Sequence, residues 1–235
     1  MFRPVRHDGF RLYAGLLSIL ILSCLGLMGC EGPGFAAYVI AGPPTIKAQY
    51  KLQTRPTLVI VDDPLGLLGD PNYPAVVGAN VGYHLKENNV LPGEMIISQD
   101  HLTTLAAQLG DRYPSTPIDE IGRRLKAEQV IHVLVRSVDL MAHNTYYHPK
   151  AQVEVRVVDV ASGKRLFPEP DSETISTSPG TPLQVSMKPQ AAEEDRRHAR
   201  SLLARRFSEY IGLCVAQVFY DHAQPDDASV SHSPS

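Results

Sequence analysis

Tryptophan is absent from this 235-residue chain, and cysteine occurs only three times. Cys24 and Cys30 lie near the amino terminus, which leaves Cys214 as the one thiol in the rest of the chain. A single thiol cannot form an internal disulfide, so a disulfide-stapled scaffold is excluded. We expect Cys214 to be a small buried apolar residue on a helix, with a reactive thiol as the alternative.

Catalytic motifs are also lacking. The sequence contains no nucleophile elbow, phosphate-binding loop, zinc helix motif or dinucleotide fingerprint. It has no basic stripe with interleaved aromatic residues and its net charge is −3, so nucleic acid is not an expected partner. These absences predict a binding protein that is not an enzyme and that uses no cofactor and no metal.

The amino terminus carries a membrane-targeting pattern. Arg3, Arg6 and Arg11 precede an uncharged apolar run from Leu12 to Met28, which is followed by a glycine and Cys30. This order resembles the signal of bacterial lipoproteins, in which the cysteine is acylated and becomes the first residue of the mature chain. The resemblance implies acyl chains such as palmitate on Cys30 and an anchor on the periplasmic side of the cell envelope, with the outer membrane favoured.

A transmembrane anchor is the alternative for the same segment. The apolar run is near the minimum length that spans a bilayer core of about 30 Å, and the arginines would keep the amino end in the cytoplasm. Either anchor places the residues after Cys30 outside the cytoplasm. We therefore divide the chain into a signal peptide (1–29), a lipidated tether (30–54), an α/β domain (55–222) and a disordered tail (223–235).

The centre of the predicted domain is a group of β-branched runs. Residues 130–135 and 153–160 are rich in valine, and the second run alternates valine with charged residues, as a strand with one covered face does. Gly163 marks a turn before residues 165–167 continue. The pattern predicts an antiparallel three-stranded meander.

The flanking segments predict helices and further strands. Residues 169–189 are rich in Ser, Thr and Pro and are predicted to form either a surface loop or a poorly ordered excursion. Leu67 and Leu68 are expected to be exposed. The fold class is α/β, a small mixed sheet in the order β-α-β-α-α-β-β-β-α. Its other elements are a strand at 57–61, a helix at 75–88, a strand at 95–97, a helix through 102–109 capped by Asp100, a helix from 116, and a long helix at 191–220.

Two stretches resemble a known group of proteins. They are Arg124 to Ile131, where a helix end leads into a strand, and Val155 to Phe167, a strand, a Gly-Lys turn and a returning strand. Both are similar to pieces of curli-secretion lipoproteins, the amino-terminal domain of TolB and penicillin-binding-protein activator lipoproteins. The resemblance implies a topology like that of anticodon-binding domains. Pore formation is not expected, because residues 140–150 and 169–189 are too short or too proline-rich for membrane-crossing hairpins.

Four residues in the first turn of the meander form the candidate contact site: His143, Tyr146, Tyr147 and His148. An exposed aromatic turn is a common protein contact, because tyrosine offers a large area at little entropic cost. The alternatives are a plain solvated turn and a Zn²⁺ site, which would need a third or fourth ligand.

A second constellation follows the strand at 57–61. Asp62 and Asp63, with Asp139 and Lys164, would resemble the Mg²⁺-binding acidic pocket of phosphoacceptor domains if the fold brought them together. The other interpretation is a strand-ending turn before Pro64.

The leading hypothesis is a membrane-anchored, non-enzymatic envelope lipoprotein that acts as a protein-binding scaffold or assembly factor. Its partners would be the membrane, through the lipid, and another envelope protein, with a homo-oligomer as an option. The alternatives are a metal-dependent envelope enzyme or module that uses Asp62, Asp63, His143 or His148, and an oligomeric export component.

The lipid anchor can be tested by substitution of the lipobox cysteine. We expect Cys30→Ser to abolish incorporation of labelled palmitate and to leave the precursor unprocessed, because serine has no thiol to acylate. Metabolic labelling and membrane sedimentation measure both effects, and Cys24→Ser in the same apolar run is the matched control. Unchanged processing and labelling of Cys30→Ser would contradict the assignment.

Overall fold

The structure is a computed structural model that describes residues 45–140, 142–143, 146–169, 180–188, 190–191 and 196–224. The predicted signal peptide, the predicted lipidation site Cys30, residues 30–44 of the predicted tether and residues 225–235 of the predicted tail lie outside the described residues. The folded unit begins at Thr45. No helix in these ranges is both long and apolar enough to cross a membrane.

The chain folds into helices and strands of unequal length. The α-helices are α3 (Tyr73–Glu87), α4 (Gln99–Leu109), α5 (Ile118–Arg124) and α6 (Arg196–Ala216), and the short 3-10 helices are η1 (Gly93–Met95), η2 (Gly110–Ser115) and η3 (Gln217–Phe219). The strands are β1 (Thr45–Ile46), β2 (Thr57–Asp62), β3 (Gln129–Asp139), β4 (Ala142–His143), β5 (Tyr146–Tyr147), β6 (Lys150–Asp159), β7 (Arg165–Phe167), β8 (Thr181–Ser186), β9 (Gln190–Ala191) and β10 (His222–Ala223).

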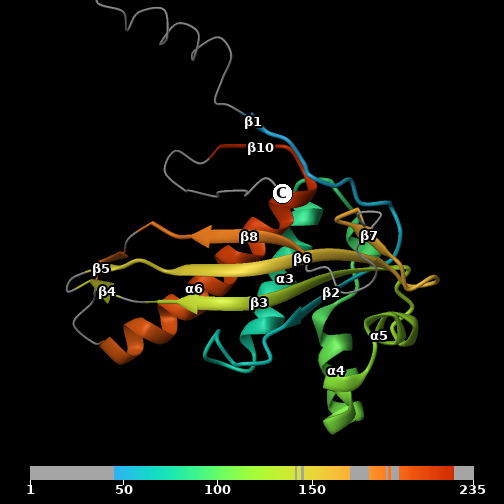
Figure 1. Ribbon diagram of the computed structural model, residues 1–235, viewed down its shortest axis with the longest axis horizontal. Coiled ribbons are helices and arrows are strands. Elements are labelled where there is room, and N and C mark those ends of the chain that lie inside the picture. The colour runs from blue at the N-terminus through green and yellow to red at the C-terminus, as the bar shows by residue number, and fades with distance from the viewer. Residues whose placement is uncertain are drawn as a thin grey trace, which may run out of the picture. The chain divides into compact units, whose positions relative to one another are not determined.

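The central sheet has the strand order β2-β3-β6-β7, and β8 pairs with the other half of β6. β2 runs parallel to β3, and the remaining pairs are antiparallel. The predicted meander is confirmed as β3, β6 and β7, and the α/β class is confirmed with it (Figure 1). Two smaller sheets are formed by β1 with β10 and by β4, β5 and β9.

Helices α3 and α6 cover one face of the central sheet, which we call the inner face (Figure 1). Alternate residues of β2 and β3 point to this face, as the pleat requires. Burial of each such valine or isoleucine side chain contributes about 1.5–3 kcal/mol. The main core therefore lies between the sheet and these two helices, and its members include Val59, Val61, Ile131, Val133, Val153, Val155, Val81, Phe207 and Ile211.

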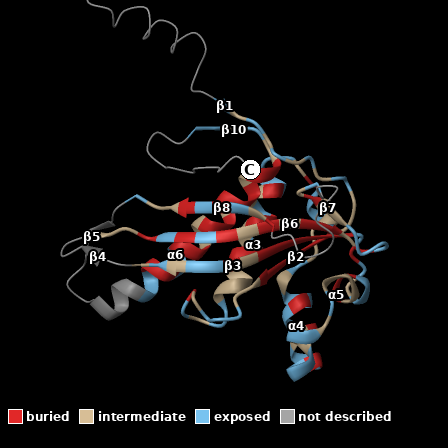
Figure 2. Cartoon of the chain, viewed as in Figure 1, coloured by how far each residue is buried: buried red, intermediate tan, exposed pale blue. Residues whose placement is uncertain are grey.

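The other face, the outer face, is covered at one end only. There α4 and α5 bury a smaller cluster that includes Leu58, Ile60 and Val130 from the strands and Leu102 and Leu105 from α4. Toward the carboxyl end of β3 the outer side chains are increasingly exposed, which Figure 2 shows as pale blue on β3, β6 and β8. No helix of the described ranges covers this end.

The predicted strand at 95–97 is wrong. Residues 93–95 form η1, and Ile96 makes one isolated bridge with Thr57 before the chain enters α4. Ile97 N–H donates to the carbonyl of Thr57 at 2.9 Å. The next such carbonyl along β2, that of Val59, accepts from the Gln99 side chain at 2.9 Å instead of from a backbone N–H group. The cap of α4 is Ser98, whose hydroxyl accepts from Asp100 N–H, and not Asp100 as predicted.

The segment 169–189 also differs from its prediction as a loop, because residues 181–186 form strand β8. Leu183 and Val185 lie opposite Val153 and Ala151 of β6, and each is 1% exposed. The segment contains a proline and has a low strand propensity of its own. It forms a strand because it pairs with β6, which is distant in the sequence.

Leu68 and Cys214 are both buried in the main core. Leu68, expected to be exposed, is only 2% exposed, and Leu67 is half-buried beside it. Cys214 is buried as predicted, and burial raises the pKa of its thiol to about 12. The thiol is therefore protonated at neutral pH, which disfavours the reactive alternative.

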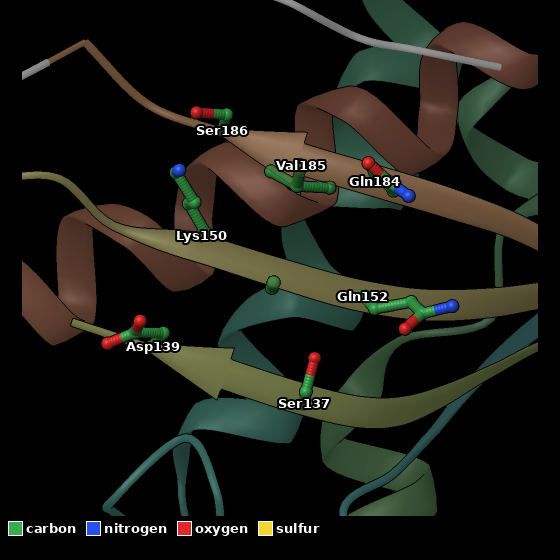
Figure 3. Close-up of a pocket in the computed structure, with 8 residues that line it drawn as sticks. Ser137, Asp139, Lys150, Gln152, Gln184, Val185 and Ser186 are labelled. Carbon is green, nitrogen blue, oxygen red and sulfur yellow. The ribbon is translucent and has the colours of Figure 1, made fainter. Parts of the chain in front are cut away.

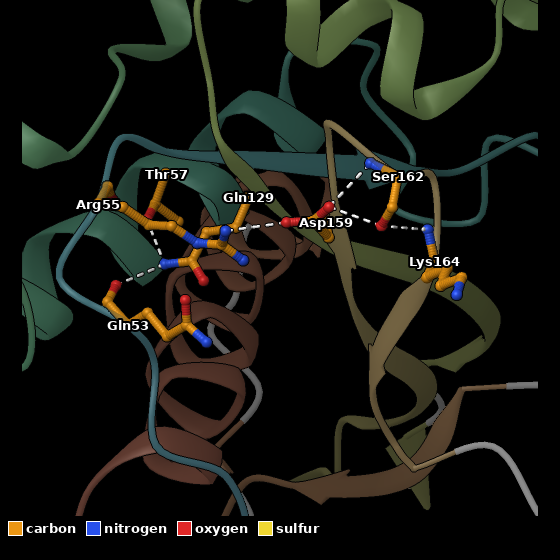
Figure 4. A network of polar contacts seen from close by, with 7 residues as sticks. All are labelled: Gln53, Arg55, Thr57, Gln129, Asp159, Ser162 and Lys164. Carbon is orange, nitrogen blue, oxygen red and sulfur yellow. Dashed lines mark hydrogen bonds and ion pairs between the residues drawn. The ribbon is translucent and has the colours of Figure 1, made fainter.

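A polar network fastens the start of β3 to the neighbouring chain segments (Figure 4). The buried Gln129 side chain donates to the Thr57 hydroxyl and to the carbonyl of Gln53, both at 2.8 Å. Arg55 Nη1 donates to Asp159 Oδ1 at 2.8 Å. Hydrogen bonds from Ser162, with the contact to Arg55, hold the pKa of Asp159 below its ordinary value. The segment before β2 is thus tied to β3 and to the turn after β6.

The contact between α3 and α6 depends on a glycine. A Cβ atom at Gly212 would lie 2.6 Å from Asn80 Cβ and 2.7 Å from the carbonyl oxygen of Val77. Both obstacles belong to the rigid frame of α3, so the two helices would have to move apart.

We expect Gly212→Ala to lower the free energy of unfolding by about 1–3 kcal/mol, as overpacking of a core does. Thermal unfolding followed by circular dichroism measures the change. Gly93→Ala is the control, since its Cβ would meet only the flexible Lys86 side chain, at 3.4 Å. Equal melting temperatures for the two variants would refute this account of the helix contact.

Candidate functional site

The candidate site is the uncovered end of the outer face, which we call the open face. Strand register places its side chains in rows across the sheet, because directly opposed residues share a face. The members of the open face that the register places are Asp62, His132, Leu134, Ser137, Asp139, Lys150, Gln152, Glu154, Arg156, Pro182, Gln184 and Ser186. Arg136 joins them through its hydrogen bonds to Glu154.

Three of these side chains form a contact chain across β2, β3 and β6. His132 is buried, with 3% of its surface exposed, and its Nε2 lies 2.6 Å from Asp62 Oδ2. Arg156 Nε donates to His132 Nδ1 at 2.9 Å. Since Nδ1 accepts a hydrogen bond, the ring proton is on Nε2 and is donated to Asp62. Both ring nitrogens of His132 are therefore engaged by these two neighbours.

Burial and the charge of Asp62 shift the pKa values of two side chains near these three residues. Burial lowers the pKa of Arg156 from its ordinary value, and the negative charge of Asp62 opposes that effect. Burial raises the pKa of Tyr113 to about 12, and the charge of Asp62 contributes in the same direction. Among the three contacting side chains, Asp62 lies at the solvent-exposed end, with 43% of its side chain accessible. The arrangement presents one carboxylate to solvent at a fixed position.

A second fixed pair lies further along β3. Arg136 donates to both carboxylate oxygens of Glu154, at 2.8 Å each, and these hydrogen bonds raise the pKa of Arg136. The register between β3 and β6 shifts between Val135 and Ser137. An additional residue at such a bulge leaves the ladder, which allows Arg136 to reach across to Glu154.

The far end of the open face is a shallow hollow of about 320 Å³. Figure 3 shows its polar side chains projecting from β3, β6 and β8 toward the same side. The hollow contains hydroxyl, amide, carboxylate and ammonium groups, so it offers both donors and acceptors. Its lining residues are Ser137, Asp139, Lys150, Ala151, Gln152, Gln184, Val185 and Ser186.

The predicted contact residues lie beside this hollow. His143 and Tyr146 are opposite each other in the β4-β5 hairpin, whose strand β5 also pairs with β9. Tyr147 and His148 are half-buried, so the aromatic turn is less exposed than expected at these two positions. His148 Nε2 is 3.1 Å from the hydroxyl of Ser186, which joins the end of the hairpin to the hollow. The side chains of His143 and Tyr146 lie outside the described residues.

The contact between Ser186 and His148 bears on the enzyme alternative. A serine nucleophile requires a histidine that is oriented by a third group and donors for the developing oxyanion. Within the described part of the chain, no carboxylate contacts His148. The absence of enzymatic activity stays a prediction.

The acidic constellation does not form a metal pocket. Both oxygens of Asp63 accept backbone hydrogen bonds, from Leu67 and Leu68, at 2.8 Å each. Asp139 is at the end of β3, whereas Lys164 follows β6 next to Asp159, at the opposite end of the sheet. The described residues hold no group of three or more His, Cys, Asp or Glu that could bind a metal. The strand-ending turn is the correct interpretation of Asp63.

The chain of Asp62, His132 and Arg156 was missed at the sequence level. His132 is the one polar residue in the run 130–135, and a polar residue inside a buried strand requires hydrogen-bond partners. That signal identifies His132 but not its partners, which lie 70 and 24 residues away.

Comparisons with known proteins give structural likenesses only. No protein-family model and no curated protein matches the chain. Lipoprotein GNA1162 from Neisseria meningitidis is 14% identical, with a TM-score of 0.37 over 66% of this chain and 94% of that one. Hypothetical protein CT253 from Chlamydia trachomatis is 18% identical, with a TM-score of 0.37 over 70% and 98%.

A PelC dodecamer from Paraburkholderia phytofirmans is a further similar structure. It is 11% identical, with a TM-score of 0.36 over 75% of this chain and 98% of that chain. The α/β class of the present chain follows from its own strand order and helix layers and does not depend on these likenesses.

The carboxylate of Asp62, although partly exposed, is predicted to stabilise the fold through its contact with His132. We expect Asp62→Ala to lower the free energy of unfolding by about 1–3 kcal/mol, because the buried imidazole N–H loses its acceptor. Asp62→Asn keeps an acceptor oxygen and should recover most of this loss. Urea unfolding of both variants measures the difference, and an Asn variant as unstable as the Ala variant would argue against a hydrogen bond at this site.

Proposed function

We propose that this protein is a membrane-anchored, non-enzymatic lipoprotein of the bacterial envelope that binds another envelope protein on the open face. The observation that supports the proposal most is the unequal cover of the sheet. Two long helices bury the inner face, whereas the outer face is covered at one end and is polar beyond it.

The open face is suited to binding because its charged groups are already positioned. Arg136 is held by two contacts with Glu154, and His132 is held on both sides by Asp62 and Arg156. Side chains that are ordered before binding lose little conformational entropy when a partner arrives. A pattern of fixed positive and negative groups favours a complementary partner over others.

The finer predictions belong to this proposal. They are acylation of Cys30, attachment on the periplasmic side with the outer membrane favoured, and kinship with the curli-secretion, TolB amino-terminal and penicillin-binding-protein activator lipoproteins. A second copy of the chain is the alternative occupant of the open face, as an oligomeric export component would require.

Site-specific photo-crosslinking in cells tests the proposal. A photoreactive residue at Gln152, in the middle of the open face, should give adducts of defined mass with a different protein. Tyr83 on α3 is the control position, because it is 57% exposed but lies on the helix side of the sheet. We expect the adduct at Gln152 to exceed that at Tyr83 by at least about tenfold, since close approach is required.

Two outcomes contradict the proposal. Equal labelling at the two positions would show that the open face has no special contact. An adduct at Gln152 whose mass is twice that of the chain would identify a second copy as the occupant, which mass photometry of the protein in detergent would check independently.

A further inference from the structure

Arg156 is a half-buried cation of the open face. It lies on β6 opposite His132 of β3, and its Nε donates to His132 Nδ1 at 2.9 Å. A guanidinium group has five N–H donors, of which this hydrogen bond uses one. The donors on both terminal nitrogens, Nη1 and Nη2, are left for other acceptors.

The described ranges contain no hydrogen-bond partner for these terminal nitrogens. There, the side chain of Arg156 makes the one hydrogen bond with His132 and no ion pair with a carboxylate. Asp62 is bound to the far side of the imidazole, and Glu154 is bound on both oxygens by Arg136. Arg156 therefore has no carboxylate of its own in the described part of the chain.

The charge of Arg156 lies in an unfavourable environment, because burial removes part of its hydration. Burial lowers the pKa of Arg156, and the like charge of Arg165 acts in the same direction. The charges of Asp62 and Glu154 oppose the shift. Arginine does not release its proton in proteins, so binding of an anion is the change that would relieve this state.

The guanidinium group is held in one orientation by its neighbours. His132 is buried, and its other ring nitrogen is fixed by Asp62 at 2.6 Å. Because Nε is bound to His132, the free edge of the group is the one formed by Nη1 and Nη2. Two parallel N–H groups on such an edge match the two oxygens of a carboxylate. A fork that is oriented before binding loses little conformational entropy when the ligand arrives.

We propose that Arg156 anchors the partner protein by forming a bidentate ion pair with the carboxylate of an aspartate or glutamate side chain of that partner. The inference rests on the proposed function and names the chemical group that the open face recognises. Arginine is among the residues that contribute most to the free energy of binding at protein interfaces.

The surrounding acids favour a carboxylate over a phosphate group. Asp62, with 43% of its side chain accessible, and Glu154 both act on Arg156 with negative charge. A phosphate monoester carries a charge of about −1.5 to −2 at neutral pH, so these acids repel it more strongly than they repel a carboxylate. A carboxylate also lies in the plane of the guanidinium fork, which a tetrahedral phosphate does not.

Leu134 adds apolar surface on the same face. It is half-buried and lies two residues after His132 on β3, opposite Glu154 of β6. Apolar groups around a charged pair exclude water, which strengthens the pair. The acidic residue of the partner is therefore expected to stand beside an apolar residue in the partner sequence.

Substitution of Arg156 in the photo-crosslinking experiment tests the inference. The full-length protein carries the photoreactive residue at Gln152 and, in addition, Arg156→Lys. Lysine keeps the charge but lacks the planar fork, so we expect the adduct with the partner to fall at least about tenfold, as loss of a hydrogen bond between charged groups does. Arg206→Lys is the matched control, because Arg206 is exposed on α6 at the helix side of the sheet, and it should leave the adduct unchanged.

Substitutions in the partner test the same pair with this protein unchanged. Mass spectrometry of the adduct identifies the partner and its crosslinked region. We expect one change of Asp to Asn or of Glu to Gln in that region to reduce the adduct as much as Arg156→Lys does. Combined with Arg156→Lys, the same change should cause no further loss, because both remove one interaction. These partner changes decide the question alone if Arg156→Lys lowers the melting temperature of this protein.

Three outcomes would overturn the inference. They are an undiminished adduct with folded Arg156→Lys protein, an equal loss with Arg206→Lys, and losses from every acidic residue of the partner that are either absent or additive with Arg156→Lys. In each of these cases the unsubstituted protein still gives its adduct at Gln152 with a different protein, so the proposed function stands while the inference fails. Absence of that adduct would contradict the proposed function itself.

Discussion

The antiparallel pairing of β3 with β6 is the constraint on which the rest of the structure depends. It sets Val133 opposite Val155 on the inner face and His132 opposite Arg156 on the outer face. A shift of one residue would turn every side chain of one strand over and bring Arg156 and Glu154 against α3 and α6. The burial of valines on one face therefore determines which polar groups are presented on the other.

The two faces of this pairing differ in what covers them. The inner face holds the larger hydrophobic core beneath α3 and α6, and the glycine at position 212 allows these two helices to pack closely. The outer face is stabilised only at the end where α4 and α5 cover it, and beyond that end it holds ordered polar groups. The bulge near Arg136 lies on this outer face, where it positions a cation without disturbing the core. The main hydrophobic core and the proposed contact surface thus lie on opposite sides of the same strands.

The features that could be predicted are those with a local signal. The alternating valines of 153–160, the turn at Gly163 and the burial of Cys214 on a helix each follow from neighbouring residues, and the structure confirms them. The errors concern segments whose state depends on distant partners. Residues 181–186 become a strand because β6 has a half that β7 leaves unpaired, and Ile96 makes only one bridge because Gln99 takes over the edge of β2.

The sequence pattern alone predicted the α/β class and which residues of the central strands point inward or outward. It also carried the resemblance of the amino terminus to a lipoprotein signal. The extent of the open face required the fold, because it depends on where α4 and α5 come to rest and on β3 being longer than β2. The chain of Asp62, His132 and Arg156 also required it, since each of these residues comes from a different strand. Periodicity within a strand specifies which face a side chain occupies, but the partner on the next strand is specified only by long-range pairing.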